Sequence, residues 1–445
     1  MKKWLLTFFV LIFSIITVQA KNIKSDFTSV IRDSGVDSAT VAISIKDANT
    51  GKIVYSLNDK MLTNPASIQK VLTAPVSVQT LGEDYKFRTE LYKRGEDSYI
   101  IKLGADPYFT SSDLKNLLSN IEKTTKRIYI DNSILDSKQW GEGWQWDDDL
   151  NVLMPRFGSY NLDGNLLKLT IMPAEDGGFA TVINPSKYPL VFVNNVRTGA
   201  KTQIDIKRDN SISANTIMLT GTVAGPCTVF IPNSNLKNYF DVRLQKTLEN
   251  KKVYMKEPIT VDRVKSTDKL VGFIEHSLNS AVQEELKTSN NMIAEVVFKL
   301  AGKKYCNLET GTDVSGIKMF NDYCKNNNLD NSKIRITDAS GVSKNNLVTA
   351  DFITEFLYKN KDNKVLRNNL PIPGEGTLRN RMLPLKQNVQ AKTGTLSNIS
   401  SLAGYLTTKS NKDYVFCIMI NDTELSPSNK KLLEEFIIKE AYIRL

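Results

Sequence analysis

Apolar, strand-like segments at the two ends of the chain restrict how it can fold. Near the N-terminus, residues 40–45 and 53–57 enclose a turn-forming segment, which predicts a β-hairpin. Near the C-terminus, residues 401–407 and 413–420 form a second pair of apolar strands. If the four strands share one sheet, the residues between them are an insertion into one domain. Surface β structure tolerates insertions because the ends of its loops lie close together.

The chain between these strands changes character along its length. An Asn-Pro start, an apolar middle and a Gly stop predict a buried helix over residues 68–81, which Pro75 should kink or shorten. Residues 164–233 are rich in Thr, Val and Ile with turn residues, which predicts a small all-β unit. Hydrophobic periodicity predicts further helices at residues 112–123, 238–251, 269–286, 290–301, 314–326 and 429–442.

The N-terminus predicts export from the cytoplasm. Lys2 and Lys3 precede an apolar run over residues 4–17, and the small-residue pattern ending at Ala20 is typical of a signal-peptide cleavage site. A membrane anchor is the alternative, but the run is shorter than the ~20 residues that a membrane span needs. We therefore expect cleavage after Ala20 and a periplasmic location.

Charge and composition exclude several classes of function. The chain has a net charge of +10, but its basic residues are scattered among acidic ones, and export argues against a nucleic-acid partner. A loose association with a membrane surface stays open. The chain has one histidine, His276, and no Cys-x-x-Cys pair among its four cysteines, so we expect no metal and no cofactor. A disulfide between Cys306 and Cys324 stays open.

Three short motifs contain the candidate catalytic residues. They are Ser67-Ile68-Gln69-Lys70, Ser289-Asn290-Asn291 and Lys392-Thr393-Gly394. Ser-x-x-Lys and Ser-x-Asn recur elsewhere in the chain, whereas Lys-Thr-Gly occurs once, so the order of the motifs matters more than any one of them. Helix capping is the alternative interpretation of the Ser and Asn residues of the second motif. A turn with a solvent-facing lysine is the alternative for Lys392.

Ser67 and Lys70 lie one turn apart on the same face of the predicted helix. A serine hydroxyl is a weak nucleophile until a base takes its proton, and a neutral lysine can do so. Burial and a second cation such as Lys392 would have to lower the pKa of Lys70 from ~10.4 to ~7–8. The strand edge, lysine charge and hydroxyls at residues 392–395 suit a peptide carboxylate, and Gly394 permits close backbone approach.

The three motifs, in this order, resemble those of the penicillin-interacting serine enzymes. The long gap between Ser67 and Asn291 resembles the class C low-molecular-mass penicillin-binding proteins, which are D-alanyl-D-alanine carboxypeptidase/endopeptidases. In that family two domains are inserted between the first two motifs. Sequence segments that resemble those of the family also occur at residues 104–107, 143–148 and 338–343.

The resemblance implies an α+β fold. A β-lactamase/transpeptidase-like domain, with an antiparallel sheet flanked by helices, would be interrupted by two mainly β inserted domains. The implied boundaries are a signal peptide at 1–20, transpeptidase-like parts at 21–85 and 234–445, inserted domain II at 86–163 and small β domain III at 164–233.

The resemblance also implies catalytic roles. Ser67 would be the acylated nucleophile and Lys70 its base, while Ser289 and Asn291 would relay a proton and orient the substrate. The backbone N–H groups of Ser67 and Thr395 would form the oxyanion hole.

Substrate-binding roles follow from the same resemblance. Lys392 and Thr393 would bind the terminal carboxylate of a stem peptide. Asp163 resembles a residue that contacts the amino end of the diaminopimelate side chain. Lys344 stands where the family often has Arg, and it offers a point charge in place of a planar fork.

The resulting hypothesis is a periplasmic serine DD-peptidase that acts on peptidoglycan stem peptides and is covalently inhibited by β-lactams. It would cleave D-Ala-D-Ala ends, and cleavage of D-Ala-diaminopimelate cross-links stays open. The alternatives are a β-lactamase and a non-catalytic peptidoglycan-binding protein. A homodimer also stays open.

Overall fold

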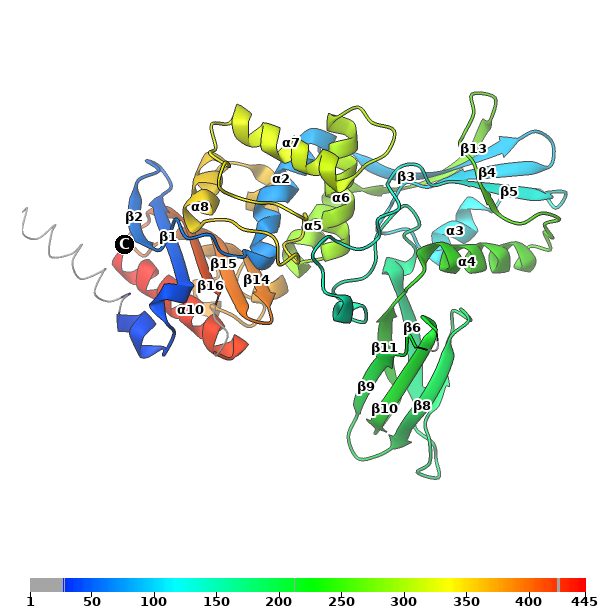
Figure 1. The fold of residues 1–445 in the computed structure, drawn as a ribbon, viewed down its shortest axis with the longest axis horizontal. Coiled ribbons are helices and arrows are strands. Elements are labelled where there is room, and N and C mark those ends of the chain that lie inside the picture. The colour runs from blue at the N-terminus through cyan, green and yellow to red at the C-terminus, as the bar shows by residue number, and fades with distance from the viewer. Residues whose placement is uncertain (1–26, 28, 212, 422–424) are drawn as a thin grey trace, which may run out of the picture. The chain divides into compact units, whose positions relative to one another are not determined.

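The computed structural model describes residues 27, 29–211, 213–421 and 425–445, and the predicted signal peptide lies outside them. The chain divides into two compact units, which Figure 1 shows in ribbon form. The first unit comprises Met1–Val76, Gln283–Ser289 and Phe320–Leu445. The second unit comprises Ser77–Val282 and Asn290–Met319.

The first unit is built on one antiparallel five-stranded sheet in the order β14-β15-β16-β1-β2. Its strands are β1 (Val41–Asp47), β2 (Ile53–Leu57), β14 (Val389–Leu396), β15 (Ile399–Thr407) and β16 (Asp413–Asn421). Strand β1 pairs with β16, and Val41 lies opposite Ile420. The strand pairs from the two ends of the chain therefore share one sheet.

Helices cover both faces of this sheet because side chains alternate along each strand. Ile43 and Ile45 of β1 share a buried cluster with residues of α10 (Pro427–Arg444). Ser44, on the opposite face, hydrogen-bonds to Thr354 of α8 (Ala350–Lys359) at 2.8 Å. On β14, Val389 and Ala391 belong to the same buried cluster as the α10 residues. Because neighbouring residues of a strand face opposite sides of the sheet, Lys392 lies on the side that α8 covers.

Two of the other helices of this unit lie next to the first two motifs, α2 at Lys70 and α5 just before Ser289. The 3₁₀ turn η2 (Ala66–Gln69) runs directly into α2 (Lys70–Leu81), which continues past Pro75 to its expected end and is not shortened. The boundary between the units falls within α2, α5 (Leu278–Thr288) and α7 (Asp313–Asn326). A short helix, α9 (Lys364–Asn369), follows α8.

The second unit contains a five-stranded sheet and two three-stranded sheets. The larger sheet has the order β12-β5-β4-β3-β13, made of β3 (Lys86–Arg94), β4 (Ser98–Lys102), β5 (Arg127–Asp131), β12 (Thr260–Val261) and β13 (Lys269–Ser277). The smaller sheets have the orders β8-β10-β9 and β11-β6-β7. Their strands are β6 (Leu166–Met172), β7 (Thr181–Ile183), β8 (Val191–Thr198), β9 (Gln203–Arg208), β10 (Thr216–Val223) and β11 (Cys227–Pro232).

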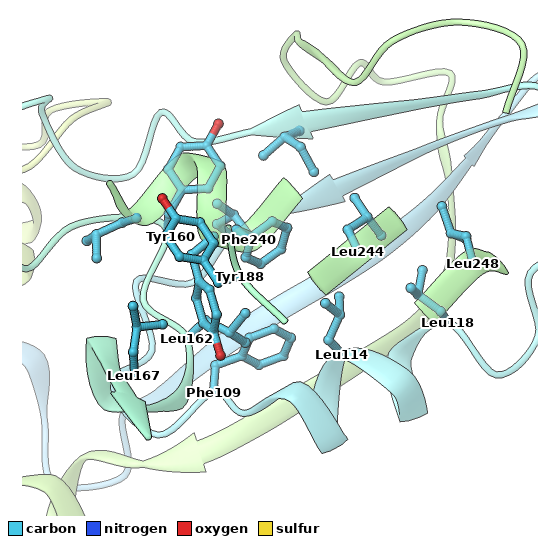
Figure 2. Close-up of a cluster of buried hydrophobic side chains, with 14 of the residues drawn as sticks. Phe109, Leu114, Leu118, Tyr160, Leu162, Leu167, Tyr188, Phe240, Leu244 and Leu248 are labelled. Carbon is cyan, nitrogen blue, oxygen red and sulfur yellow. The ribbon is translucent and has the colours of Figure 1, made fainter. Parts of the chain in front are cut away.

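Two helices pack together with the strands in the hydrophobic core of the second unit. They are α3 (Ser111–Leu117) and α4 (Leu236–Asn250), and the third helix α6 (Asn291–Tyr305) follows the second motif. Figure 2 shows Leu114 and Leu118 on one side of this core facing Phe240, Leu244 and Leu248 of α4.

Several expectations differ from the structure. Residues 269–286, expected as one helix, form strand β13 followed by α5, because β13 pairs with β3 on both sides of an irregularity between Leu270 and Gly272. Residues 234–282 lie in the second unit, where β12 and β13 complete its larger sheet. The helix expected at 112–123 ends at Leu117.

All four cysteines are free thiols, so Cys306 and Cys324 form no disulfide in the structure. Within the described part of the chain, no helix is long and apolar enough to cross a membrane. No group of His, Cys, Asp and Glu side chains that could hold a metal ion occurs among those same residues.

Candidate active site

Ser67 lies in a strained turn at the start of α2. The preceding residue, Ala66, has a φ of 48°, which is in the left-handed region that non-glycine residues rarely adopt. Asn64 holds this turn, because its side-chain oxygen accepts a hydrogen bond from the Ala66 N–H at 2.9 Å and its Nδ2 donates to the Ser343 carbonyl at 3.0 Å. The Ser67 side chain is thereby presented at a partly exposed position.

Lys70 is completely buried, with 0% of its side chain exposed, yet its amine faces the serine. Lys70 Nζ donates to Ser67 Oγ at 3.0 Å and to the Ser340 carbonyl at 2.7 Å. The expected serine–lysine pair is therefore formed within hydrogen-bond distance. This geometry suits proton transfer between a hydroxyl and an amine.

The Ser340 carbonyl is held by a loop that the sequence motifs did not include. The buried carboxylate of Asp338 accepts hydrogen bonds from the backbone N–H groups of Gly341 and Ser343 at 2.9 and 2.7 Å, and from the Asn346 side chain at 2.7 Å. The sequence of residues 338–343 resembles that of the family, but only the structure shows that the Ser340 carbonyl of this loop accepts a hydrogen bond from Lys70.

A second serine–lysine pair involves the second and third motifs. Lys392 Nζ donates to Ser289 Oγ at 2.8 Å and to the Thr393 carbonyl at 2.8 Å. Ser289 has a φ of 67°, and the adjacent Asn290 caps α6 through the Ile293 N–H. The helix-cap alternative therefore describes Asn290 and not Ser289. Lys392 is 0% exposed, so the solvent-facing alternative for it is wrong.

Gly394 allows the edge strand β14 to approach the turn that contains Ser67. A Cβ atom at position 394 would lie 2.2 Å from Ser401 Oγ, 2.9 Å from the Pro65 carbonyl oxygen and 3.0 Å from Ala66 Cβ. Only glycine fits such an approach. Thr393 is buried, whereas Thr395 on the same strand is exposed.

Burial and nearby charges shift the pKa values of Lys392 and Glu285. Burial, reinforced by the Lys70 cation, lowers the pKa of Lys392 well below its usual range, while Glu285 acts in the opposite direction. Burial raises the pKa of Glu285 to about 8, although Lys70 and Lys392 both oppose the shift. Sequence reasoning did not single out Glu285, which lies four residues before Ser289 on α5.

Three of the predicted residues are not among these contacts. Asn291 belongs to the second unit, where its Nδ2 donates to the Leu153 carbonyl at 2.8 Å. Asp163 also belongs there, and its carboxylate accepts hydrogen bonds from Ser111 N at 2.8 Å and Tyr239 Oη at 2.8 Å. The contact of Asp163 with the diaminopimelate side chain of a stem peptide stays a prediction. Lys344 is exposed and directly follows the 338–343 loop.

This arrangement provides a partly exposed hydroxyl, a buried amine hydrogen-bonded to it, and a second buried amine paired with a second hydroxyl. Such a set can accept a proton from a nucleophile and return it to a leaving group without histidine or metal. Comparison with known proteins assigns the chain to a family. The model of the D-Ala-D-Ala carboxypeptidase 3 (S13) family matches residues 23–438.

The chain belongs to this family. It is therefore an enzyme of the serine-type D-Ala-D-Ala carboxypeptidase class, and the resemblance inferred from the motifs is confirmed. A D-alanyl-D-alanine carboxypeptidase of Actinomadura sp. (strain R39) is 26% identical over 425 residues, covering 86% of this chain and 78% of the relative. This membership favours the peptidase over the β-lactamase alternative.

Solved structures show the same fold. The crystal structure of penicillin binding protein 4 (dacB) from Haemophilus influenzae matches with a TM-score of 0.81 at 22% identity, covering 94% of this chain and 99% of that chain. The structure of that protein complexed with a β-lactam matches with a TM-score of 0.74 at 21% identity, covering 91% and 96%. The α+β, transpeptidase-like fold expected from the sequence is confirmed.

Proposed function

We propose that this enzyme removes the terminal D-Ala from peptidoglycan stem peptides through an acyl-enzyme on Ser67. The observation that supports this assignment most strongly is the 3.0 Å hydrogen bond between Lys70 Nζ and Ser67 Oγ at a partly exposed position. The family membership supports the substrate class, and the hydrogen-bond geometry supports Ser67 as the nucleophile and Lys70 as its base.

Acylation begins when the neutral Lys70 amine takes the Ser67 hydroxyl proton as Oγ attacks the carbonyl carbon of the D-Ala-D-Ala amide. The negative charge that develops on the carbonyl oxygen is stabilised by the backbone N–H groups of Ser67 and Thr395. The proton passes to the leaving nitrogen with help from Ser289, the C–N bond breaks and D-Ala leaves. An ester to Ser67 remains, which water hydrolyses to regenerate the enzyme.

Substrate binding divides between buried and exposed groups of β14. Lys392 is buried and bonded to Ser289, so its proposed effect on the substrate carboxylate is electrostatic. A direct hydrogen bond to the carboxylate would come from the hydroxyl of the exposed Thr395, and a contact of the buried Thr393 with the carboxylate stays a prediction. Lys344 is exposed, which suits its proposed contact with a side-chain carboxylate of the stem peptide.

Finer parts of the proposal have separate support. Acylation of Ser67 by β-lactams is supported by the β-lactam complex of the Haemophilus influenzae protein. A periplasmic location follows from the export signal predicted at residues 1–20. The substrate-orienting role of Asn291, cleavage of D-Ala-diaminopimelate cross-links, a homodimer and a loose membrane association stay predictions, as do the domain boundaries at residues 85, 163 and 233.

The experiment is release of D-Ala from a defined pentapeptide by the purified protein. Wild type should release D-Ala, and Ser67→Ala should not. The matched control is Ser112→Ala, which changes another Ser-x-x-Lys serine at an exposed position and should act like wild type. Release by Ser67→Ala at the wild-type rate would contradict the proposal. A cross-linked peptide dimer, assayed in parallel, tests endopeptidase action.

A further inference from the structure

Three side chains at the start of α2 donate hydrogen bonds to three consecutive carbonyl groups of the 338–343 loop. The pairs are Gln69 Nε2 with the Asp338 carbonyl at 2.5 Å, Thr73 Oγ1 with the Ala339 carbonyl at 2.8 Å and Lys70 Nζ with the Ser340 carbonyl at 2.7 Å. All six residues are buried. The proposed mechanism uses Lys70 as the base, but it assigns nothing to Gln69 or Thr73.

Gln69 binds the loop at two points. Besides the Asp338 carbonyl, its Nε2 reaches Asn346 Oδ1 at 3.1 Å, and Asn346 Nδ2 donates to the Asp338 carboxylate at 2.7 Å. The Gln69 side-chain oxygen, Oε1, is buried without a hydrogen-bond partner in the described part of the chain. Such an atom destabilises a fold, and an apolar side chain of the same size would avoid that cost. The donated hydrogen bonds therefore explain the amide better than packing does.

The loop lies directly against the turn that contains Ser67. Gly341 has a φ of 84°, and a Cβ atom there would lie 1.9 Å from the Ala66 carbonyl oxygen and 3.0 Å from Gln69 Cβ. Only glycine fits such an approach. A displacement of the loop would therefore move the Ser340 carbonyl relative to the Ser67 hydroxyl.

The Ser340 carbonyl restricts the direction of the Lys70 amine. A neutral amine has two N–H groups and one lone pair, and the lone pair has to point at the Ser67 hydroxyl for the proton to pass. An N–H donated to the Ser340 carbonyl limits rotation of the amine. Misplacing a reacting group by roughly 1 Å can lower a rate by about 10²-fold. The position of this carbonyl should therefore affect the rate of acylation.

We propose that Gln69 and Thr73 are positioning residues that hold the loop carbonyls in place and so direct the Lys70 amine at Ser67. Gln69 holds the carbonyl two residues before Ser340, and Thr73 holds the carbonyl one residue before it. Neither side chain exchanges a proton, because Lys70 takes the Ser67 proton and the leaving nitrogen receives it. The role rests on the proposed acyl-enzyme on Ser67.

The test separates binding of a fluorescent penicillin from the acylation step. Labelling rates over a range of penicillin concentrations give the acylation rate constant at saturation and the half-saturating concentration. Gln69→Met keeps the size of the side chain and removes both hydrogen bonds. Its rate constant should fall by about 10-fold or more, while the half-saturating concentration stays within about twofold of wild type. Gln79→Met makes the same change at an exposed position of α2, and this matched control should act like wild type.

Two Thr73 variants distinguish hydrogen bonding from packing. Thr73→Ser keeps the hydroxyl and loses a methyl group, whereas Thr73→Val keeps the shape and loses the hydroxyl. Thr73→Ser should acylate within about threefold of the wild-type rate, and Thr73→Val should be slower than wild type by about 10-fold. A packing role would give the reverse order. This pair decides the proposal if Gln69→Met does not fold.

The outcomes distinguish this role from the proposed function. Wild-type rate constants for Gln69→Met and Thr73→Val, with folding checked by circular dichroism, would overturn the positioning role and leave the acyl-enzyme proposal standing. A change confined to the half-saturating concentration, or a Thr73→Ser variant slower than Thr73→Val, would overturn the role as well. Absence of labelling in wild type would overturn the acyl-enzyme proposal itself.

Discussion

Ser401 Oγ donates a hydrogen bond to the Pro65 carbonyl at 2.6 Å, which ties strand β15 to the turn that contains the nucleophile. The two residues come from opposite ends of the chain, and the shared sheet brings them together. A Cβ atom at position 394 would clash with both Ser401 Oγ and the Pro65 carbonyl oxygen. The position of Ser67 relative to Lys392 therefore depends on how closely β14 and β15 approach that turn.

Replacing Gly394 tests this dependence. Gly394→Ala should displace β14 from the turn, and a displacement of roughly 1 Å can lower a rate by about 10²-fold. We expect acylation by fluorescent penicillin to slow by about that factor while circular dichroism stays unchanged. Gly225→Ala is the control, because nothing lies within 4 Å of the added Cβ. Equal rates for the two variants would contradict the prediction.

Asp338 should be important for stability as well as for catalysis. Asp338→Ala would leave the N–H groups of Gly341 and Ser343 buried without acceptors, and each such loss costs about 1–3 kcal/mol. We expect the free energy of unfolding, measured by denaturant titration, to fall by at least about 2 kcal/mol. Asp330→Ala, at an exposed position, should change it by less than about 0.5 kcal/mol. A similar effect of both variants would argue against this role.

Much of the candidate site could be predicted from sequence because it depends on local spacing. Ser67 and Lys70 are one turn apart in any helix, and the apolar residues around them predict burial. The sequence shows that strands occur at both ends of the chain, but it does not show that they pair with each other or in which register. Pairing of Val41 with Ile420 is a long-range contact that no local pattern encodes.

Other features depend on contacts that the sequence does not reveal. Strand β13 was expected as a helix because a short apolar run fits either structure, and its partner β3 decides the outcome. Asp338 acts through a buried hydrogen-bond network, whose members are ordinary turn residues in the sequence. Glu285 has one weak signal, an acidic side chain one turn before Ser289, and only its burial beside two lysines makes it notable.

Arg381 and Glu434 form a buried ion pair in the first unit. Arg381 Nη2 lies 2.9 Å from Glu434 Oε2, and the Glu434 side chain is fully buried. Arg381→Ala would leave that carboxylate uncompensated, so we expect the free energy of unfolding to fall by about 3–5 kcal/mol. Arg444→Ala removes a more exposed partner of Glu440, and its effect should stay below about 1 kcal/mol. Thermal and denaturant unfolding measure both, and a loss below 1 kcal/mol for Arg381→Ala would contradict the prediction.

Glu285 also predicts a pH dependence of stability. Folding raises its pKa from 4.5 to about 8, so between those values the folded chain holds a proton that the unfolded chain has lost. The contribution of this group is complete below the unfolded pKa and is lost as the pH rises through 8. Glu285→Gln cannot ionise. The melting temperature of the variant minus that of wild type should therefore increase from about pH 5 to about pH 9. A difference independent of pH would rule this out.

The role of Lys70 as the base is tested most directly by the acylation rate of two Lys70 variants with fluorescent penicillin. Lys70→Met removes both the charge and the base, and Lys70→Arg keeps a charge that cannot be given up. If a neutral Lys70 takes the Ser67 proton, both variants should fold and acylate about 10²–10⁴-fold more slowly than wild type. Near-wild-type acylation by folded Lys70→Arg would contradict the mechanism.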